Sequence, residues 1–213
     1  ARRRVTFPEG FTVAQMAERI EAQLGIPQAA FLAAARGLRA TRNVGFRLPL
    51  GKLEGYLFPS TYDLPVGEAP EFVVGELLAG FRRSFFLPNE ARIKARGLSL
   101  HEIVTLASLV EREARVPRER ALIAGVLQNR LDRGMRLQCD ATVQYALPRH
   151  KSRLLYTDLQ VKSPYNTYLH AGLPPGPICN PGLACLEAAL APAKTDCLFY
   201  VARPDGSHVF TRT

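Results

Sequence analysis

The sequence predicts an α+β protein that is mainly helical, with short strands near both ends of the chain. Apolar residues recur at helical spacing through the middle, whereas the alternating patterns typical of strands are confined to the first and last segments. Hydrophobic residues make up 47% and charged residues 22% of the 213 residues. These proportions exclude a disordered chain, a collagen-like fibre and a coiled coil, and no segment approaches the ~20 apolar residues of a membrane span.

The first fifty residues predict a strand and two helices, which would form a small N-terminal lobe. Residues 5–7 are strand-like, and Thr12 is placed to cap a helix that Gly25 would end. A second helix would pass through Phe31 and stop at Gly37.

Residues 53–64 are rich in Gly, Pro and aromatic side chains, so we expect strand and loop that line an interface between lobes. A helix through residues 72–86 would follow and end at Pro88. We therefore expect an N-terminal lobe over residues 1–92 and a second, larger domain over residues 93–213.

The second domain would begin with a capped helix. Ser99 and Glu102 have the spacing of a capping box. The apolar residues that follow recur at helical spacing and define one buried face. Pro117 would end this helix and begin another, which Gly134 would end.

Three further elements would complete this domain. Asp140 could cap a short helix that reaches Leu147, and Asn180, which a proline follows, is a good N-cap for a helix over residues 183–190. Residues 197–210 predict a C-terminal hairpin with a turn that contains Pro and Gly.

The chain is basic, with 28 Lys and Arg against 19 Asp and Glu, a formal charge of +9 and a pI near 9.8. Such an excess favours polyanionic partners, which include nucleic acid, an acidic membrane surface and an anionic cell-wall polymer. The basic residues are scattered, and no helix interleaves them with aromatics. A solvated basic surface is therefore the better interpretation, and we expect no nucleic acid as partner.

The four cysteines predict no metal site, because they form no CxxC pair and the four His are dispersed. Disulfides and small buried apolar side chains fit this pattern equally well.

Glu111 and Glu113 lie at the end of the capped helix. Residues two apart point to nearly opposite sides of a helix, so the two carboxylates cannot act as a pair on one substrate atom. One could face a cleft while the other is solvated. In the alternative, both are surface residues paired with neighbouring arginines.

Residues 163–178 have no helical period, and three prolines fall within four positions after Leu173. A long rigid loop of this kind fits a polar ligand site. Its aromatic rings and side-chain amides are the groups with which sugar-binding grooves hold their ligands, although a proline-rich loop can also be simply rigid.

The chain carries a series of motifs in this order: Glu54-Gly55, Ala107-Ser108-Leu109-Val110-Glu111-Arg112-Glu113, Asn129-Arg130-Leu131, Met135-Arg136-Leu137-Gln138 with Asp140, Ser163 to Tyr168, Gly172 to Ile178, and Gly206-Ser207-His208-Val209-Phe210. This series resembles the endolytic murein transglycosylases, the YceG-like lytic transglycosylases, over nearly the whole chain. The resemblance implies cleavage of the MurNAc-β-1,4-GlcNAc bond inside nascent peptidoglycan strands. The product would be a 1,6-anhydroMurNAc end, and glycan elongation would terminate.

The resemblance also implies roles for particular residues. The family's catalytic acid maps onto Glu113 by its position in the Glu-x-Glu motif, with Glu111 as the fallback. The expected substrate-binding residues are Tyr165, Asn166 and Thr167, with Gln138 and Glu54 as weaker candidates. For Gln138 and Asp140, helix capping is an equally good interpretation, and His208 is expected to be a hairpin residue.

A single acid would suffice because the C6 hydroxyl of the substrate itself attacks the anomeric carbon, whereas ordinary glycosidases need two carboxylates. The acid would first donate a proton and then accept one, which a raised pKa favours.

The family further implies no cofactor and no metal, a penicillin-binding synthase as neighbour, and one membrane-spanning helix in the full-length protein. That helix would hold the catalytic part on the periplasmic face of the inner membrane. The alternative is a non-catalytic peptidoglycan-binding or scaffold module of the cell-wall synthesis machinery.

Overall fold

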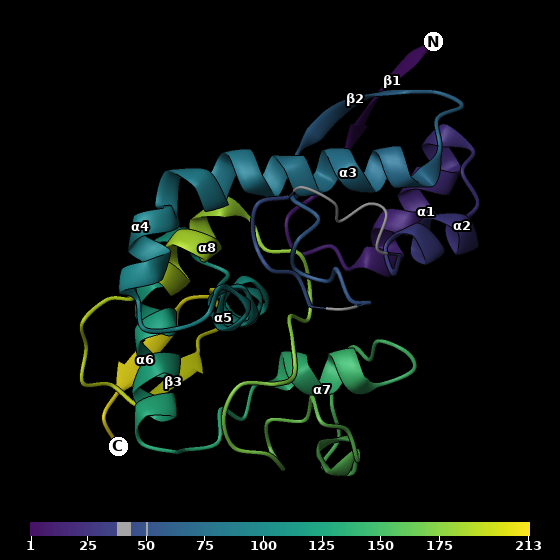
Figure 1. Ribbon diagram of the computed structural model, residues 1–213. Helices are drawn as coiled ribbons and strands as arrows, with labels where there is room; N and C mark the ends of the chain where they lie inside the picture. Colours follow the sequence, from purple (N-terminus) through teal and green to yellow (C-terminus); the bar gives the residue numbers. More distant parts are fainter. Residues whose placement is uncertain (38–43, 50) are drawn as a thin grey trace. The chain divides into compact units, whose positions relative to one another are not determined.

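The computed structural model describes residues 1–37, 44–49 and 51–213, which divide into two compact units (Figure 1). The first unit comprises Ala1–Gly97 and Cys179–Leu183, and the second comprises Leu98–Ile178 and Ala184–Thr213. The predicted α+β class is confirmed. The boundary lies five residues later than the expected position after residue 92, and a short late segment belongs to the first unit.

The first unit begins with the predicted strand and two helices. Strand β1 (Arg2–Thr6) pairs antiparallel with β2 (Thr61–Pro65), and helices α1 (Val13–Leu24) and α2 (Gln28–Ala34) lie between them in the sequence. Thr12 caps α1 in a capping box with Gln15, and Gly25 ends it at a φ of 72°. Such a positive φ favours glycine, because other residues meet a steric penalty there.

The expected helix end at Pro88 is wrong. Helix α3 (Pro70–Phe81) continues through a π-helical turn, η1 (Arg82–Phe86), into α4 (Leu87–Ala95), with Pro88 in the first turn of α4. A proline breaks a regular helix because it lacks an N–H and its ring clashes with the carbonyl four residues earlier. In the π-turn, the N–H of Leu87 bonds to the carbonyl of Arg82 five residues earlier, a wider spacing that accommodates the ring.

Asn180 is not the helix cap that the sequence predicts. Its side-chain oxygen accepts hydrogen bonds from the N–H groups of Gly55 and Leu57 at 2.9 and 3.0 Å, and its amide nitrogen donates to Glu54 at 2.9 Å. Asn180 is fully buried. These bonds lie within the first unit and tie the segment 179–183 to it.

The second unit is built on the capped helix α5 (Leu100–Glu113). Ser99 accepts from the N–H of Glu102, whose carboxylate accepts from the N–H of Ser99 at 2.8 Å, which confirms the capping box. Residues 103–110 are all buried. The remaining elements of this part of the chain are η2 (Pro117–Glu119), α6 (Arg120–Asp132), α7 (Asp140–Ala146), η3 (Asp158–Gln160), α8 (Leu183–Leu190), β3 (Phe199–Ala202) and β4 (His208–Thr211).

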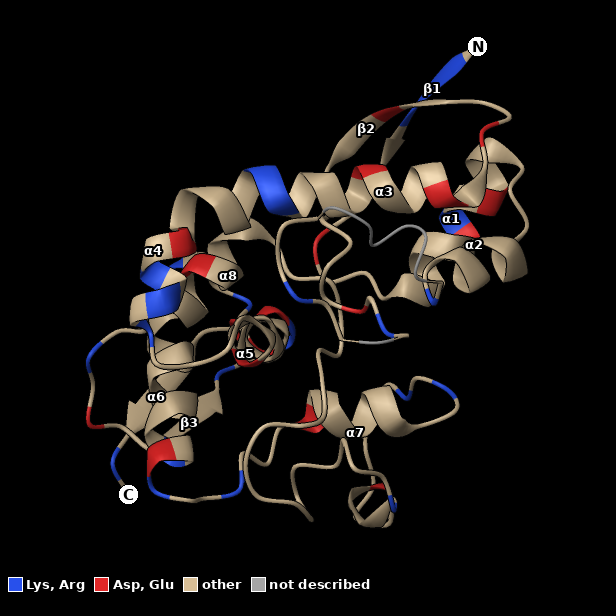
Figure 2. Cartoon of the chain, in the orientation of Figure 1, with Lys and Arg blue, Asp and Glu red and all other residues tan. Residues whose placement is uncertain are grey.

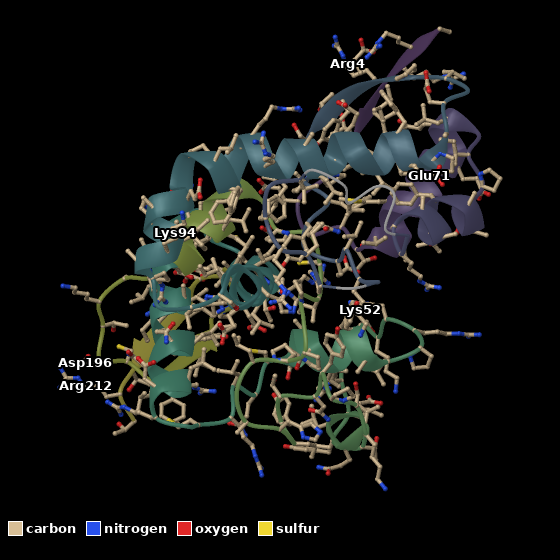
Figure 3. The ribbon with its side chains drawn as sticks, in the orientation of Figure 1. Arg4, Lys52, Glu71, Lys94, Asp196 and Arg212 are labelled. Atoms are coloured by element: carbon tan, nitrogen blue, oxygen red, sulfur yellow. The ribbon has the colours of Figure 1, made fainter. Side chains whose placement is uncertain are left out.

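The predicted C-terminal hairpin is confirmed, since β3 and β4 pair antiparallel. Arg130 of α6 is buried and binds the chain on either side, donating to the carbonyls of Leu198 at 2.6 Å and Leu137 at 2.7 Å. Figure 3 shows an ion pair between Asp196 and Arg212 at the surface of the same region. The bond from Arg130 to the carbonyl of Leu198 attaches the start of the hairpin to α6.

Asp140 is the first residue of α7, and Cys139 holds the cap position without a side-chain hydrogen bond. The expectation that Asp140 caps this helix is therefore wrong.

All four cysteines lie in the described part of the chain, and each is a free thiol. Within residues 1–37, 44–49 and 51–213, no helix has the length and apolar character needed to cross a bilayer.

Candidate active site

A cavity of about 230 Å³ lies within the second unit. Its walls come from the end of α5, from α6, from the segment before α7, from the loop that follows α7 and from the C-terminal hairpin. The lining residues are Glu113, Arg130, Leu137, Gln138, Asp140, Tyr168, Tyr200, Ala202 and His208. They combine two carboxyl groups, a guanidinium, an imidazole and two phenols, so the cavity is suited to a polar ligand.

Glu113 is the last residue of α5, where the chain leaves the helix in an extended conformation at Ala114. Burial raises the pKa of the Glu113 carboxyl above its ordinary value, and the nearby carboxylate of Asp140 raises the pKa further. Hydrogen bonding to Tyr200 and the charge of His208 act in the opposite direction but do not cancel the effect of burial. A raised pKa favours the acid form of a carboxyl group, which is the form that donates a proton.

Tyr200 lies directly beside this acid. Its hydroxyl donates a hydrogen bond to the Glu113 carboxylate and is also in hydrogen-bond contact with the thiol of Cys139. Burial, followed by the charges of Cys139 and Glu113, raises the pKa of Tyr200 well above its ordinary value. Tyr200 therefore remains a neutral donor that fixes the orientation of the carboxyl group.

The hairpin brings His208 into the same cavity. Ala202 pairs with His208 across the two strands, and side chains two apart on a strand share a face, so Tyr200, Ala202 and His208 all reach the cavity. The rings of Tyr200 and His208 meet edge to face with centroids 5.3 Å apart.

Glu119 fixes the position of His208 through two hydrogen bonds. Its carboxylate accepts from Nδ1 of His208 at 2.8 Å and from the backbone N–H of His208 at 3.3 Å. The side chains are only 6% (His208) and 9% (Glu119) exposed. The hydrogen bond from His208 is the main cause that lowers the pKa of Glu119.

Gln138 and Tyr168 form another wall. Gln138 has a φ of 52°, the one positive φ among the described residues other than glycine. The Tyr168 hydroxyl donates to Asp140 at 2.5 Å, and burial followed by this bond raises the pKa of Tyr168. A residue held at an unfavourable φ requires support from its neighbours.

Thr167 provides that support. Its carbonyl accepts from the N–H of Gln138 at 3.2 Å, and its hydroxyl accepts from the N–H of Cys139 at 3.0 Å. A second bond, 2.9 Å long, joins its hydroxyl to that of Thr142. Thr167 therefore fixes the backbone that presents Gln138.

The described residues that line the cavity include none from 165–167, which were expected to bind substrate. Asn166 and Thr167 are buried, and the Asn166 amide donates to the carbonyls of Leu159 and Val161 at 3.0 and 2.9 Å. Tyr165 is half-buried, with its ring centroid 5.0 Å from that of Tyr145.

Of the other expected residues, Glu113 and Gln138 line the cavity, whereas Glu111 is not among the lining residues that the structure describes. Glu54 lies in the first unit, where its carboxylate accepts from the N–H of Val13 at 3.0 Å and from Asn180.

Sequence reasoning assigned no role in the site to several residues that meet there. Arg130, Tyr168 and His208 were within quoted motifs, but a motif does not say which of its members point inward. Tyr200 could have been found only by pairing the two strands of the hairpin. No sequence pattern pointed to Glu119, because its hydrogen bond with His208 forms only when the fold brings η2 next to β4.

An α+β unit with a half-buried acid of raised pKa in a polar cavity is suited to general acid–base chemistry. The chain belongs to the YceG-like family, which it matches over residues 1–213. An endolytic murein transglycosylase of Bacillus subtilis (strain 168) is 44% identical over 161 residues, which cover 76% of this chain and 45% of the relative. Another, from Streptococcus pneumoniae serotype 2 (strain D39), is 33% identical over 221 residues and covers 93% of this chain and 40% of the relative.

The chain therefore spans less than half the length of these curated relatives. A YceG-like protein of Listeria monocytogenes, known from a crystal structure, has a TM-score of 0.88 and 36% identity. The match covers 99% of this chain and 73% of the other.

Proposed function

We propose that this chain is the catalytic part of an endolytic lytic transglycosylase that cleaves the MurNAc-β-1,4-GlcNAc bond of peptidoglycan. The observation that carries the proposal is the position of Glu113, a half-buried acid of raised pKa in the wall of a polar cavity. The names of the relatives support the substrate class.

Glu113 serves as both proton donor and proton acceptor. The protonated carboxyl donates to the bridging oxygen, so that the bond between this oxygen and the anomeric carbon of MurNAc breaks. The C6 hydroxyl of the same MurNAc then attacks that carbon and gives its proton to the Glu113 carboxylate. The reaction forms a 1,6-anhydro bond, consumes no water and leaves Glu113 protonated, as it began.

Intramolecular attack explains why one carboxyl group suffices. The attacking hydroxyl is already attached to the reacting sugar, so its effective concentration is high. The second carboxylate of the cavity, Asp140, is bound by the Tyr168 hydroxyl and has no proton-transfer role in this scheme.

The remaining lining residues position the acid and the sugar. Tyr200 orients Glu113, and Gln138 and Tyr168 contact the glycan. Asn166 and Thr167 act through the backbone they hold.

The expected setting of the whole protein extends this proposal. In the full-length protein, a single membrane-spanning helix would hold the catalytic part outside the cytoplasm, beside a penicillin-binding synthase, where cleavage would terminate strand elongation.

The test is to incubate the purified chain with peptidoglycan and to analyse the products by mass spectrometry. The expected products carry 1,6-anhydroMurNAc ends. Glu113→Gln abolishes them, and Glu111→Gln, the matched control on the same helix, retains them. Hydrolysed reducing ends would contradict the one-acid scheme, and unaltered glycan with retained binding would favour the scaffold module.

A further inference from the structure

The loop that follows α7, residues 148–162, presents two neighbouring apolar side chains to solvent. Tyr156 is 90% exposed and Leu155 is 57% exposed, so neither is covered by the second unit. Apolar side chains that lie next to each other and are exposed are typical of surfaces that contact a partner.

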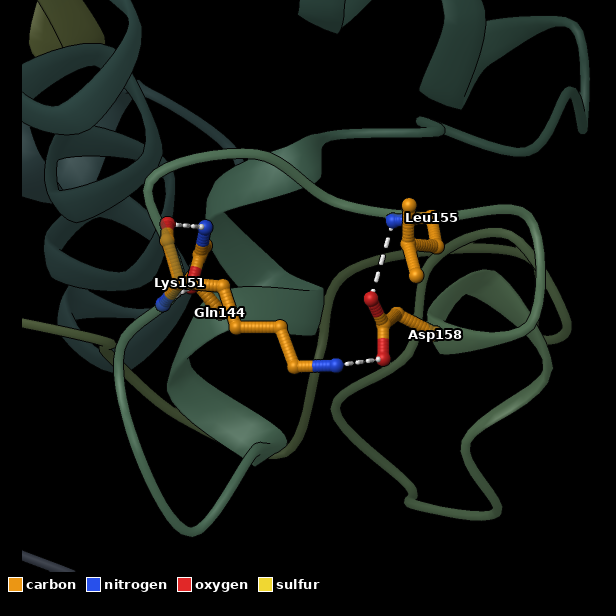
Figure 4. A network of polar contacts seen from close by, with 4 residues as sticks. All are labelled: Gln144, Lys151, Leu155 and Asp158. Carbon is orange, nitrogen blue, oxygen red and sulfur yellow. Dashed lines mark hydrogen bonds and ion pairs between the residues drawn. The ribbon is translucent and has the colours of Figure 1, made fainter.

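The loop is held in place by the network in Figure 4. The Gln144 side chain donates to the carbonyl of Lys151 at 2.7 Å and accepts from its N–H at 3.0 Å. Asp158 accepts from Nζ of Lys151 at 2.6 Å and from the N–H of Leu155 at 2.8 Å. Hydrogen bonds therefore fix the loop both before and after the two exposed apolar side chains.

The loop has an excess of positive charge. Four cations, Arg149, Lys151, Arg153 and Lys162, accompany one carboxylate, Asp158, which leaves +3. Asp158 is buried and bound to Lys151, whereas Arg149, Arg153 and Lys162 are exposed. Figure 2 shows basic residues in the loop after α7.

We propose that residues 148–162 dock on an anionic lipid surface, with Leu155 and Tyr156 entering the interfacial region and the exposed cations facing the headgroups. An aliphatic and an aromatic side chain flanked by cations is typical of interfacial membrane contacts. The headgroups supply the negative charge that the cations require. A glycan is the weaker candidate, because Arg and Lys offer donors but no acceptors to sugar hydroxyls. This contact is independent of the proposed catalytic activity.

The chain contains no tryptophan, which allows a direct test. Tyr156→Trp introduces a single reporter at the tip of the loop, and Val201→Trp provides a matched control on β3, where Val201 is 63% exposed. With vesicles of phosphatidylglycerol and phosphatidylcholine in equal parts, the Tyr156→Trp emission should shift to the blue and be quenched by brominated lipid. The Val201→Trp emission should stay unchanged, as should both emissions with pure phosphatidylcholine.

A variant with two fewer positive charges measures the electrostatic contribution to vesicle binding. In the Tyr156→Trp chain, adding Arg149→Gln and Arg153→Gln should weaken binding to the mixed vesicles by roughly 30-fold, from about 1 kcal/mol per basic residue. Added salt should weaken binding of the unaltered chain as well.

Co-sedimentation of the wild-type chain with the same vesicles provides a second measurement that does not depend on the reporter. Leu155→Ser with Tyr156→Ser should abolish it while the melting temperature stays unchanged. Equal binding to neutral and anionic vesicles, or no binding to either, overturns the proposal. A blue shift of Tyr156→Trp with isolated glycan strands and none with vesicles also overturns it, in favour of a glycan contact.

Discussion

The Nδ1 atom of His208 lies 2.8 Å from a carboxylate oxygen of Glu119, and both side chains are almost fully buried beside the cavity that Glu113 lines. Because Nδ1 donates to Glu119, the tautomer of a neutral imidazole is fixed and Nε2 is its acceptor. The charge of His208 acts to lower the pKa of Glu113. Glu119 is not among the described residues that line the cavity, but it can affect the pKa of Glu113 through His208, which lines it.

Glu119→Gln should lower kcat by roughly tenfold or more, with a smaller change in KM. The amide oxygen can still accept a hydrogen bond from His208, but an uncharged acceptor binds the imidazole less strongly than the carboxylate does, so the ring beside Tyr200 is held less firmly. Glycan cleavage is measured over a range of concentrations, and Glu111→Gln serves as the control. A loss confined to KM would argue that Glu119 acts on substrate binding instead.

Glu119→Ala should destabilise the protein by roughly 1–3 kcal/mol, because the buried N–H donors of His208 lose their acceptor. The pKa of Glu119 is lowered in the folded state, so its carboxylate stabilises the fold at neutral pH. This contribution is lost as pH falls through the lowered folded pKa. The difference in unfolding free energy between wild type and variant, measured with urea, should therefore decrease on acidification.

Glu113→Gln should raise the free energy of unfolding at neutral pH by roughly 0.5–2 kcal/mol while abolishing activity. Burial raises the pKa of Glu113 in the folded state. Its contribution to the free energy of unfolding is therefore fully present below the unfolded pKa and is lost as pH rises through the folded pKa. The gain should thus disappear in acid. Equal stability of wild type and Glu113→Gln across pH would contradict the raised pKa of the acid.

Tyr200→Phe should move the alkaline limb of the pH profile of kcat/KM to higher pH. The hydrogen bond from Tyr200 lowers the pKa of Glu113, so its removal lets this pKa rise further, and the active acid form persists to higher pH. Tyr168→Phe removes a hydroxyl bound to Asp140 instead and is the matched control. An identical shift in both variants would refute a specific role for Tyr200.

Gln138→Gly should be more stable than Gln138→Ala by about 1 kcal/mol, because only glycine adopts a φ of 52° without steric cost. Both variants remove the side chain from the cavity, so both should lose activity to a similar extent. Thermal unfolding and glycan cleavage separate the two effects. Full activity in either variant would exclude Gln138 from glycan binding.

Sequence patterns predicted two helix caps and the hairpin correctly, because the groups that interact there are close together in the sequence. The cap at Thr12, the capping box at Ser99 and the C-terminal hairpin depend on residues a few positions apart, and all three are present. Pro88 and Asn180 were misjudged because their surroundings come from elsewhere. A π-turn accommodates the proline, and Asn180 bonds to residues more than 120 positions away.

The sequence by itself determined the family motifs and the mainly helical α+β class, and the resemblance carried by these motifs points to Glu113 as the acid, with Glu111 as the fallback. Only the tertiary structure decided which side chains accompany Glu113, since Tyr200 and His208 reach it through strand pairing and Glu119 through a contact across 89 positions. The physical reason is that burial and hydrogen bonding set the pKa of an acid, and both depend on residues that are distant in the sequence. For the same reason, the side chains of Asn166 and Thr167 were found to bind backbone groups of other residues in the second unit.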